Sequence, residues 1–262
     1  MDSSLEIRLF GGLQLNLNGS PLTGLTSHKV AALLAFLAVE RRPHSREILA
    51  ALLWGGLPDV DARNTLRQTL TNLRKLVGPY LLIDRETVTF LATPPCAVDV
   101  DAFLHNLKNA EGQGEAGQVE SWQAASAVYA GDFLAGFVVR DAPEYEEWLL
   151  AQRARYRELA LHALHALTEL LMARGEYGRA VDSAARLLAL DPWREEAHRQ
   201  LMRLKARTGQ RSAAIAQYEI CRQVLEQELG VEPSAETTAL HERLKAAQRG
   251  PRHNLPGSLT GF

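Results

Sequence analysis

Cysteine is scarce in this chain, which holds two such residues, Cys96 and Cys221, among its 262. Two cysteines cannot form a network of disulfide bonds or supply four zinc ligands, so we expect two reduced thiols in a cytoplasmic protein. Long apolar runs are also missing, since no stretch reaches the roughly 18 residues that a membrane-spanning helix needs. The opening MDSSLEIRLF lacks the basic and then apolar pattern of a signal peptide. We therefore expect no membrane partner.

A strong excess of one charge is absent as well. The net charge is −2, so the chain as a whole does not attract polyanions, and any nucleic-acid binding has to rest on local placement of cations. The sequence contains no G-x-x-x-x-G-K-[ST] motif for nucleotide phosphates and no G-x-S-x-G or Cys–His pattern for a nucleophile. These absences predict a protein that is not an enzyme and needs no cofactor.

Other residues that could form a metal site, a carboxylate pair or a base-stacking surface do not complete one. His162 and His165 are three residues apart on a predicted helix, but no third ligand is placed to complete a metal site, so we expect none. Asp99 and Asp101 stand at a predicted helix start, where aspartate usually caps the helix. Four aromatic residues are more typical of the core of the predicted solenoid than of a base-stacking platform. They are Trp122, Tyr129, Phe133 and Phe137.

The first part of the chain combines short strands with helices. LEIRLF and LQLNL alternate apolar and polar residues on either side of GG, which predicts a strand pair. Residues 28–40, HKVAALLAFLAVE, are typical of a buried helix. Pro43 follows, and Ser45 is a suitable N-terminal cap for a second helix, SREILAALLW.

A third helix and a hairpin complete this part. GGLPD interrupts the helical pattern, Asp59 or Asp61 begins the third helix, and Gly78 and Pro79 end it. LLID and TVTFL then form a short hairpin around residues 85–86. The order of strand pair, three helices and hairpin predicts a winged helix-turn-helix, in which a β-hairpin wing follows the reading helix.

The third helix, within ARNTLRQTLTNLRKLVGP (residues 62–79), has two different sides. At 100° per residue, one side is apolar. It carries Leu66, Leu70, Leu73, Leu76 and Val77. The opposite side carries Arg63, Asn64, Arg67, Gln68, Thr71, Arg74 and Lys75, of which four are cationic and none is acidic. Such a face suits the major groove of DNA, where Arg pairs with guanine and Asn or Gln pairs with adenine.

We divide the candidate DNA contacts by their expected role. The centre of the polar face is expected to read bases: Asn64, Arg67, Gln68 and Thr71. The flanks are expected to hold phosphates: Arg63, Arg74 and Lys75. Ser45 and Arg46 at the start of the second helix are candidates for the DNA backbone, and Arg85 at the wing tip for the minor groove. The alternative is a solvated face on which Arg74 and Lys75 only favour the helix dipole.

The rest of the chain contains an internal repeat. From Asp99 onward the pattern is helical, with a flexible break expected at residues 112–117, GQGEAG. Five pairs of similar residues are separated by 34 positions, which is the tetratricopeptide period. The pairs are Leu167 and Leu201, Leu170 and Leu204, Gly175 and Gly209, Ala180 and Ala214, Val181 and Ile215. The glycines are expected in tight turns and the alanines where helices pack closely, so the sequence predicts an α-solenoid.

Several segments resemble a known pair of modules. The N-terminal part resembles the winged-helix DNA-binding domain of the response-regulator output type. The second part resembles the bacterial transcriptional activator domain found beside it in activators of the Streptomyces antibiotic regulatory protein type. The resemblance is carried by VDVDAF (98–103), YAGDFLAGF (129–137), EEWL (146–149), LLALDPWREEAHRQLM (187–202) and QYEICRQVLEQELGVEPSAET (217–237).

The expected organisation is mainly α with small β elements. Residues 1–95 form the winged helix-turn-helix DNA-binding domain, and residues 96–248 form the tetratricopeptide-like bacterial transcriptional activator domain. Residues 249–262 form a linker or the start of a downstream domain. Within them, HNLPGSLTGF resembles the segment that leads into the nucleotide-binding domain of large signal-transducing ATPase regulators. That likeness implies that this chain is the N-terminal portion of a longer protein with a downstream ATPase domain.

The resemblance implies a bacterial transcriptional activator. Such a protein binds direct repeats in promoter DNA, recruits RNA polymerase and pairs as a homodimer on the DNA, in the cytoplasm and associated with the nucleoid. Two other hypotheses stay open. One is a protein-interaction scaffold whose winged helix does not read DNA. The other is a repeat domain that senses a small ligand or peptide, or that packs against the downstream ATPase.

Overall fold

The computed structural model describes residues 4–91, 95–112 and 114–249. By compactness the chain divides into two units, Met1–Ala163 and Leu164–Phe262. The expected boundary between residues 95 and 96 lies elsewhere, because it marks the place where the sequence motifs change. The domain limits 1–95, 96–248 and 249–262 stay a prediction. From residue 250 on, the expected linker and the segment resembling the approach to an ATPase lie outside the described residues.

The first unit begins with a four-stranded sheet in the order β3-β2-β1-β7. β1 (Leu5–Arg8) pairs antiparallel with β2 (Gln14–Leu17), and this confirms the predicted strand pair. β3 (Ser20–Pro21) pairs with β2, and β7 (Cys96–Val98) pairs parallel with β1. The sequence does not predict these two edge strands, because two or three residues are too few to show an alternating pattern.

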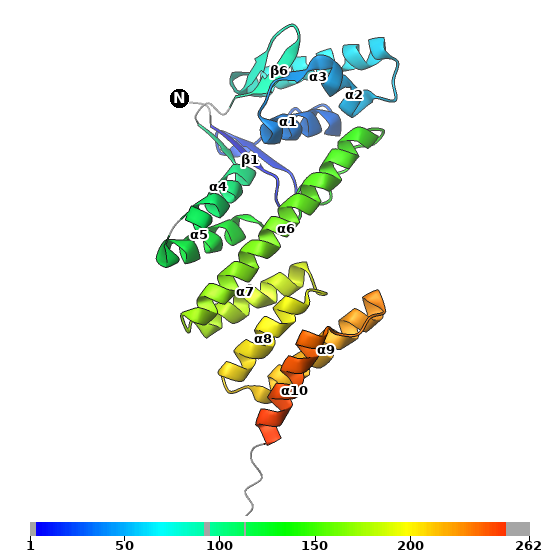
Figure 1. Cartoon of the computed structure of the whole chain (residues 1–262). Helices are drawn as coiled ribbons and strands as arrows, with labels where there is room; N and C mark the ends of the chain where they lie inside the picture. Colours follow the sequence, from blue (N-terminus) through cyan, green and yellow to red (C-terminus); the bar gives the residue numbers. More distant parts are fainter. Residues whose placement is uncertain (1–3, 92–94, 113, 250–262) are drawn as a thin grey trace, which may run out of the picture. The chain divides into compact units, whose positions relative to one another are not determined.

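Three helices and a second small sheet follow in the first unit, with the hairpin that contains β6 beside α3 (Figure 1). The helices are α1 (His28–Glu40), α2 (Arg46–Trp54) and α3 (Asp59–Val77), and η1 (Gly78–Tyr80) is a 3-10 turn. The sheet has the order β4-β6-β5. Its strands are β4 (His44–Ser45), β5 (Leu81–Ile83) and β6 (Thr87–Phe90). The predicted helix-turn-helix and hairpin are confirmed, and β4 adds a third strand that the sequence does not predict.

Helix α1 is confirmed as a buried helix, and its burial extends over every side. All residues from Val30 to Ala38 are buried. α1 packs against α2, α3 and β6, and a distant segment, α6 (Pro143–Ala173), covers a further part of it. The Trp148 ring of α6 lies 5.0 Å from the Phe36 ring, centroid to centroid, and Trp148 Nε1 donates a hydrogen bond of 2.8 Å to Glu40 Oε1.

The remainder of the first unit packs helices against the end of β1. α4 (Asp99–Gly112) lies against α5 (Glu115–Val128), so the flexible break expected at 112–117 is wrong for Gly112, which ends α4, and for residues 115–117, which begin α5. The Phe10 ring lies 5.2 Å from the Phe103 ring and joins the strand to α4. Of the four aromatic residues expected in the solenoid core, three are buried and the fourth, Phe137, is half-buried. The three are Trp122, Tyr129 and Phe133. All four, however, lie in the first unit, where the Tyr129 ring packs 5.0 Å from the Phe10 ring.

The carboxylate of Asp99 links the start of α4 to the first sheet. Its Oδ1 accepts a hydrogen bond of 2.8 Å from the main-chain N–H of Val100, the next residue. A capping side chain accepts from the N–H two or three residues later, and Asp99 is itself the first residue of α4, so this bond is not the expected cap. The Oδ2 of Asp99 accepts hydrogen bonds from the main-chain N–H groups of Leu9 at 2.7 Å and Phe10 at 2.9 Å. Asp99 therefore has a structural role at the end of β1.

The second unit is a set of paired helices (Figure 1). From Leu164 it contains the end of α6, then α7 (Tyr177–Leu190), α8 (Glu195–Arg207), α9 (Arg211–Leu229) and α10 (Ala235–Arg249). Gly175 and Gly209 occupy the turns before α7 and α9 with φ of +75° and +80°. Ala180 and Ala214 are fully buried at the same place in α7 and α9, the second helices of successive pairs. The predicted tetratricopeptide-like arrangement is confirmed.

Three expectations concern reactive groups and membranes. In the described residues no group of His, Cys, Asp or Glu could hold a metal ion, and the His162 ring packs edge-on against Trp122 at 5.4 Å. Cys96 and Cys221 are free thiols. None of the helices in the described ranges is long and apolar enough to cross a membrane.

Candidate nucleic-acid interface

Helix α3 presents two chemically different sides, as its sequence predicts. It begins at Asp59, directly after Pro58, and its first turn carries two acidic residues while Arg74 and Lys75 lie in its last turn. Both arrangements favour the helix dipole. On the apolar side Leu76 is half-buried and the other predicted residues are buried. The buried ones are Leu66, Leu70, Leu73 and Val77.

The polar side of α3 is open to solvent along its whole length. Every residue that the sequence places on this side is exposed: Arg63, Asn64, Arg67, Gln68, Thr71, Arg74 and Lys75. Among the described residues, no carboxylate lies within the 4.0 Å of an ion pair from any of the four cations. Their positive charge is therefore not neutralised within this part of the chain and is available to an anionic partner.

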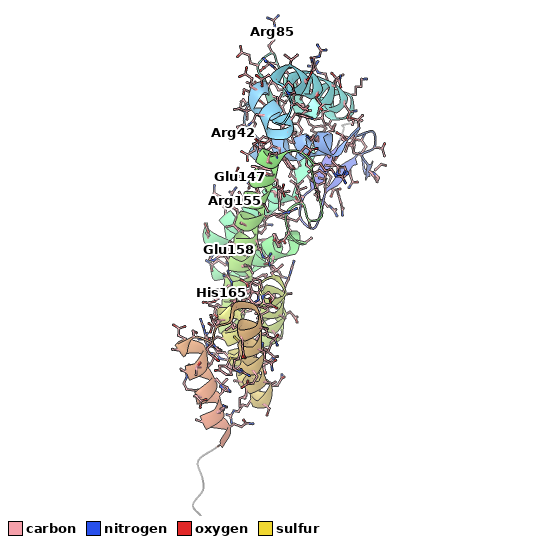
Figure 2. The ribbon with its side chains drawn as sticks, turned by 90° about the vertical axis from the view of Figure 1, so that its right-hand side faces the viewer. Arg42, Arg85, Glu147, Arg155, Glu158 and His165 are labelled. Atoms are coloured by element: carbon pink, nitrogen blue, oxygen red, sulfur yellow. The ribbon has the colours of Figure 1, made fainter. Side chains whose placement is uncertain are left out.

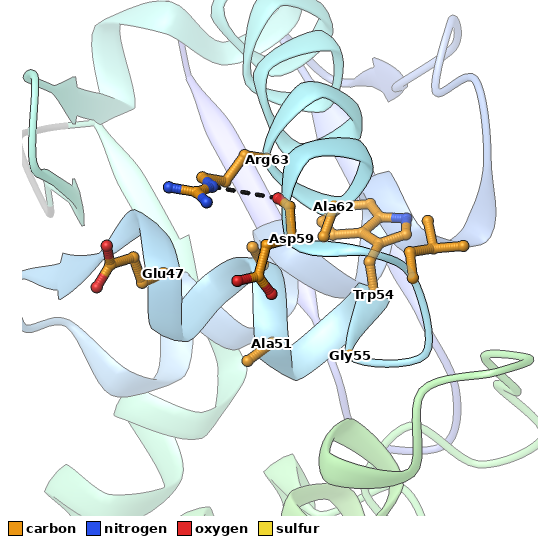
Figure 3. A pocket seen from close by; sticks show the side chains of 9 residues that line it. Glu47, Ala51, Trp54, Gly55, Asp59, Ala62 and Arg63 are labelled. Atoms are coloured by element: carbon orange, nitrogen blue, oxygen red, sulfur yellow. Dashed lines mark hydrogen bonds between the residues drawn. The ribbon is translucent and has the colours of Figure 1, made fainter.

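Arg63 differs from the other cations of α3 in its surroundings (Figure 3). It lines a pocket of about 430 Å³ between α2 and the start of α3, together with Glu47, Trp54 and Asp59. Its Nε donates a hydrogen bond of 3.2 Å to the main-chain carbonyl oxygen of Asp59, one turn earlier. The guanidinium is thus turned back toward a pocket that also contains two carboxylates, and of the four cations of α3 Arg63 is the least suited to a phosphate.

The start of α2 is held in place by two side chains that the sequence proposes for DNA contacts. Ser45 caps the helix, because its Oγ accepts a hydrogen bond of 3.2 Å from the main-chain N–H of Ile48. Arg46 is half-buried, and its Nη2 donates a hydrogen bond of 2.6 Å to the main-chain carbonyl oxygen of Asp84 in the wing. The Nε of Arg46 is buried without a hydrogen-bond partner in the described chain.

The turn of the wing is closed by the carboxylate of Asp84. Its Oδ1 accepts hydrogen bonds from the main-chain N–H groups of Thr87 at 2.6 Å and Glu86 at 2.8 Å, and its Oδ2 accepts one from the Thr87 hydroxyl at 2.9 Å. These bonds, foremost the one from the Thr87 main chain, hold the pKa of Asp84 below its ordinary value. The closed turn leaves Arg85 exposed at the tip, where Figure 2 shows its side chain extending away from the ribbon.

The last turn of α3, the wing and the start of α2 are neighbours. Arg74 Nη2 lies 3.4 Å from the carbonyl oxygen of Ile83 in β5, and Arg46 reaches the adjacent Asp84. The structure therefore brings together the candidates Arg74, Arg46 and Arg85 from three elements that are far apart in sequence. Cations on a helix and on an adjacent hairpin tip can contact phosphates on both sides of one groove.

Sequence reasoning misses two residues that shape this surface. The carboxylate of Asp84 closes the wing turn, and Asn72 on α3 donates a hydrogen bond of 3.1 Å to the main-chain carbonyl oxygen of Gly24. Asn72 joins α3 to the segment before α1, a partner 48 residues away. An Asp two residues before Glu86 is a recognisable turn signal, whereas nothing local in the sequence indicates the partner of Asn72.

Residues 98–245 match the family model described as the bacterial transcriptional activator domain. The chain is 28% identical over 247 residues to the regulatory protein AfsR of Streptomyces griseus, a match that covers 92% of this chain and 24% of AfsR. It is 27% identical over 271 residues to the transcriptional regulatory protein MoaR1 of Mycobacterium tuberculosis, covering 98% of this chain and 84% of MoaR1. The chain thus spans about a quarter of the length of AfsR. These relatives are named as regulators, in agreement with a protein that is not an enzyme.

A solved structure has a similar fold. The structure of Mycobacterium tuberculosis EmbR in complex with a low-affinity phosphopeptide has a TM-score of 0.74 to this chain, at 24% sequence identity. The match covers 94% of this chain and 66% of the EmbR chain. At this level of identity the likeness concerns the fold alone.

Proposed function

This chain belongs to the bacterial transcriptional activator domain family of regulators, and from that premise we propose that it activates transcription by binding specific promoter sequences. The winged helix-turn-helix binds the DNA, with α3 in the major groove and the wing at the neighbouring backbone. The tetratricopeptide-like helices serve protein partners. Recruitment of RNA polymerase is the step by which bound protein raises transcription.

The exposed cationic side of α3 is the observation that supports this proposal most strongly. Arg67, Arg74 and Lys75 face solvent without an ion pair in the described ranges, next to a wing whose tip presents Arg85. The helix dipole accounts for Arg74 and Lys75 in the last turn without a ligand. It does not account for Arg67 in the middle of the helix or for Arg85 on the wing. Phosphate contacts by such cations release counterions, which gives affinity, and contacts of Arg67, Asn64 and Gln68 with base edges give sequence choice.

We propose that the DNA sequence bound by this chain is a direct repeat. One short reading helix makes few base contacts, so a single winged helix binds with modest affinity. Two protomers on adjacent half-sites raise the affinity, because the second binding event occurs at a high effective concentration. We therefore expect a homodimer that forms on DNA rather than in free solution.

The first test is selection of duplexes from a random DNA pool with the whole chain, followed by titration of the selected duplex at several salt concentrations. We expect a repeated half-site and an affinity that falls about a hundredfold between roughly 50 and 200 mM salt, as about four phosphate contacts require. A matched control is Lys108→Ala, which removes an exposed cation of α4 and is expected to leave the salt dependence unchanged. Enrichment of no sequence, with salt-independent binding, would contradict the proposal and favour a protein-interaction scaffold.

A further inference from the structure

Thr71 lies in the middle of the exposed side of α3 but lacks the nitrogen donors of its neighbours. Its Oγ1 lies 2.8 Å from the main-chain carbonyl oxygen of Arg67, one turn earlier in the helix. A carbonyl oxygen only accepts hydrogen bonds, so the hydroxyl proton of Thr71 is donated to it. Sequence alone groups Thr71 with the hydrogen-bonding readers Asn64 and Gln68. The hydrogen bond to Arg67 means that Thr71 has no proton left to donate to a base.

The position of Thr71 brings it close to any duplex bound by α3. Arg67 precedes it by one turn, and Arg74 and Lys75 follow it by one turn, all of them exposed. These cations have long side chains, whereas threonine is short, so contact of Thr71 with a base requires a close approach of the helix backbone at this position. Because the substituents of Cβ are staggered, turning Oγ1 back toward the Arg67 carbonyl leaves the Cγ2 methyl as the group that faces away from it.

With its proton engaged, Thr71 can offer DNA only the acceptor lone pairs of Oγ1, which is turned toward the helix, and its Cγ2 methyl. The major groove offers one apolar group to such a methyl, the C5-methyl of thymine. We propose that Thr71 determines specificity at one T·A base pair in each half-site, through contact between its Cγ2 methyl and the thymine methyl. The inference rests on the proposed function, because it requires α3 to lie in the major groove.

The test uses the whole chain and a duplex selected from the random pool, resynthesised with deoxyuridine in place of one thymine at a time. This exchange removes the C5-methyl and leaves the Watson–Crick pair intact. We expect one thymine per half-site at which the Kd rises about fourfold, the change that corresponds to one buried methyl group. The Kd at the other thymines is expected to stay within about twofold of the unmodified duplex.

Two variants separate the methyl of Thr71 from its hydroxyl. Thr71→Val keeps the methyl, and we expect it to bind within about twofold of the wild type and to respond to deoxyuridine in the same way. Thr71→Ser keeps the hydroxyl, and we expect about fourfold weaker binding that no longer responds to deoxyuridine. Valine and threonine have similar helix propensities, so folding is maintained.

Thr65→Val is the matched control. The Thr65 hydroxyl also donates to a carbonyl oxygen four residues earlier, that of Asp61 at 2.8 Å, but its side chain is half-buried and lies off the polar side. We expect the Kd of this variant to be unchanged for every duplex. A loss of tenfold or more in Thr71→Val, with normal binding by Thr71→Ser, would overturn the proposal, because the hydroxyl lone pairs would then be the reader.

Salt dependence distinguishes failure of this inference from failure of the proposed function. A defined half-site and a steep salt dependence, with no response to deoxyuridine at any position, would overturn the thymine contact alone. Absence of both a half-site and a salt dependence would overturn the proposed function, and the thymine contact with it.

Discussion

The guanidinium of Arg46 donates a hydrogen bond of 2.6 Å from Nη2 to the main-chain carbonyl oxygen of Asp84. The main-chain N–H of Arg46 also donates to the carbonyl oxygen of Glu86 at 2.9 Å. The first residue of α2 is thus bonded to the residues on both sides of Arg85. Arg46 is therefore a positioning residue for the wing tip, and this role follows from geometry that the sequence does not reveal.

Replacement of Arg46 by methionine should disturb both folding and DNA binding. Arg46→Met keeps the length of the side chain but removes its donors, so the side-chain bond to Asp84 is lost while the main-chain bond to Glu86 remains. We expect the free energy of unfolding to fall by about 1–2 kcal/mol, as for loss of a charge-assisted hydrogen bond. Affinity for the selected duplex should fall as well. Urea unfolding and DNA titration of the same preparation measure the two effects.

Arg85→Ala serves as the comparison for that variant. Arg85 is exposed at the wing tip, so we expect its removal to change the free energy of unfolding by less than about 0.5 kcal/mol. The slope of log affinity against log salt concentration should fall in magnitude by about one. If Arg46→Met is as stable as the wild type and binds like Arg85→Ala, then Arg46 contacts DNA directly and does not position the wing.

Arg67→Ala and Arg74→Ala are expected to weaken DNA binding in different ways. Arg67 lies at the centre of the polar side, so its removal should cost about 1–3 kcal/mol at the selected site and relax the choice of one base pair. Arg74 lies in the last turn of α3 beside the wing. Its removal should weaken binding to all DNA sequences alike. It should also reduce the slope of log affinity against log salt concentration by about one. Titration of selected and scrambled duplexes measures both, and normal binding by both variants would place the reading surface elsewhere.

The first unit should lose stability in mild acid because of His44. This side chain is 3% exposed, packs 4.8 Å from the Phe36 ring, and its Nε2 has no hydrogen-bond partner in the described ranges. Burial lowers the pKa of His44, the nearby Arg42 lowers it further, and Glu40 opposes both. The unfolded chain, with an ordinary histidine pKa of about 6.5, therefore binds a proton that the folded chain does not. Stability is present above about pH 6.5 and is lost as the pH falls toward the lowered pKa of the folded state.

Urea unfolding at pH 7.5 and pH 5.5 tests this expectation with the variant His44→Leu. The variant should lose less stability between the two pH values than the wild type does. Burial also lowers the pKa of His198 and His241 in the second unit, so part of the acid sensitivity is expected to remain. An equal loss of stability in the variant and the wild type would show that His44 does not contribute.

The turns of the repeat require glycine. Gly175 has φ of +75°, and Gly175→Ala would place a Cβ in a conformation that L residues rarely adopt, although no neighbouring atom obstructs it. We expect this variant to lower the free energy of unfolding by about 1–2 kcal/mol. Gly178→Ala is the matched control, because Gly178 lies within α7 without a positive φ and also has open space around it. That control should be neutral or up to about 1 kcal/mol more stable, since alanine favours a helix, and similar stabilities of the two variants would contradict the argument.

Local patterns were sufficient for much of this fold. The apolar run of residues 28–40, the cap at Ser45, the GGLP interruption before α3 and the 34-residue spacing each depend on interactions within a few residues or on a repeated unit. The predicted helices and the β5–β6 hairpin appear in the structure for that reason. The short strands β4 and β7 depend on pairing with distant segments, so no local pattern indicates them.

Some features of the candidate site also follow from local sequence patterns, and others do not. Helical periodicity by itself determined that one side of α3 is polar and exposed and that the other side anchors it in the core. Only the tertiary structure decided that Arg46 is bonded to the wing and that Arg63 turns toward a pocket with two carboxylates. The physical reason is range: periodicity follows from the geometry of one helix, whereas the partner of a long side chain depends on which distant segments folding brings beside it.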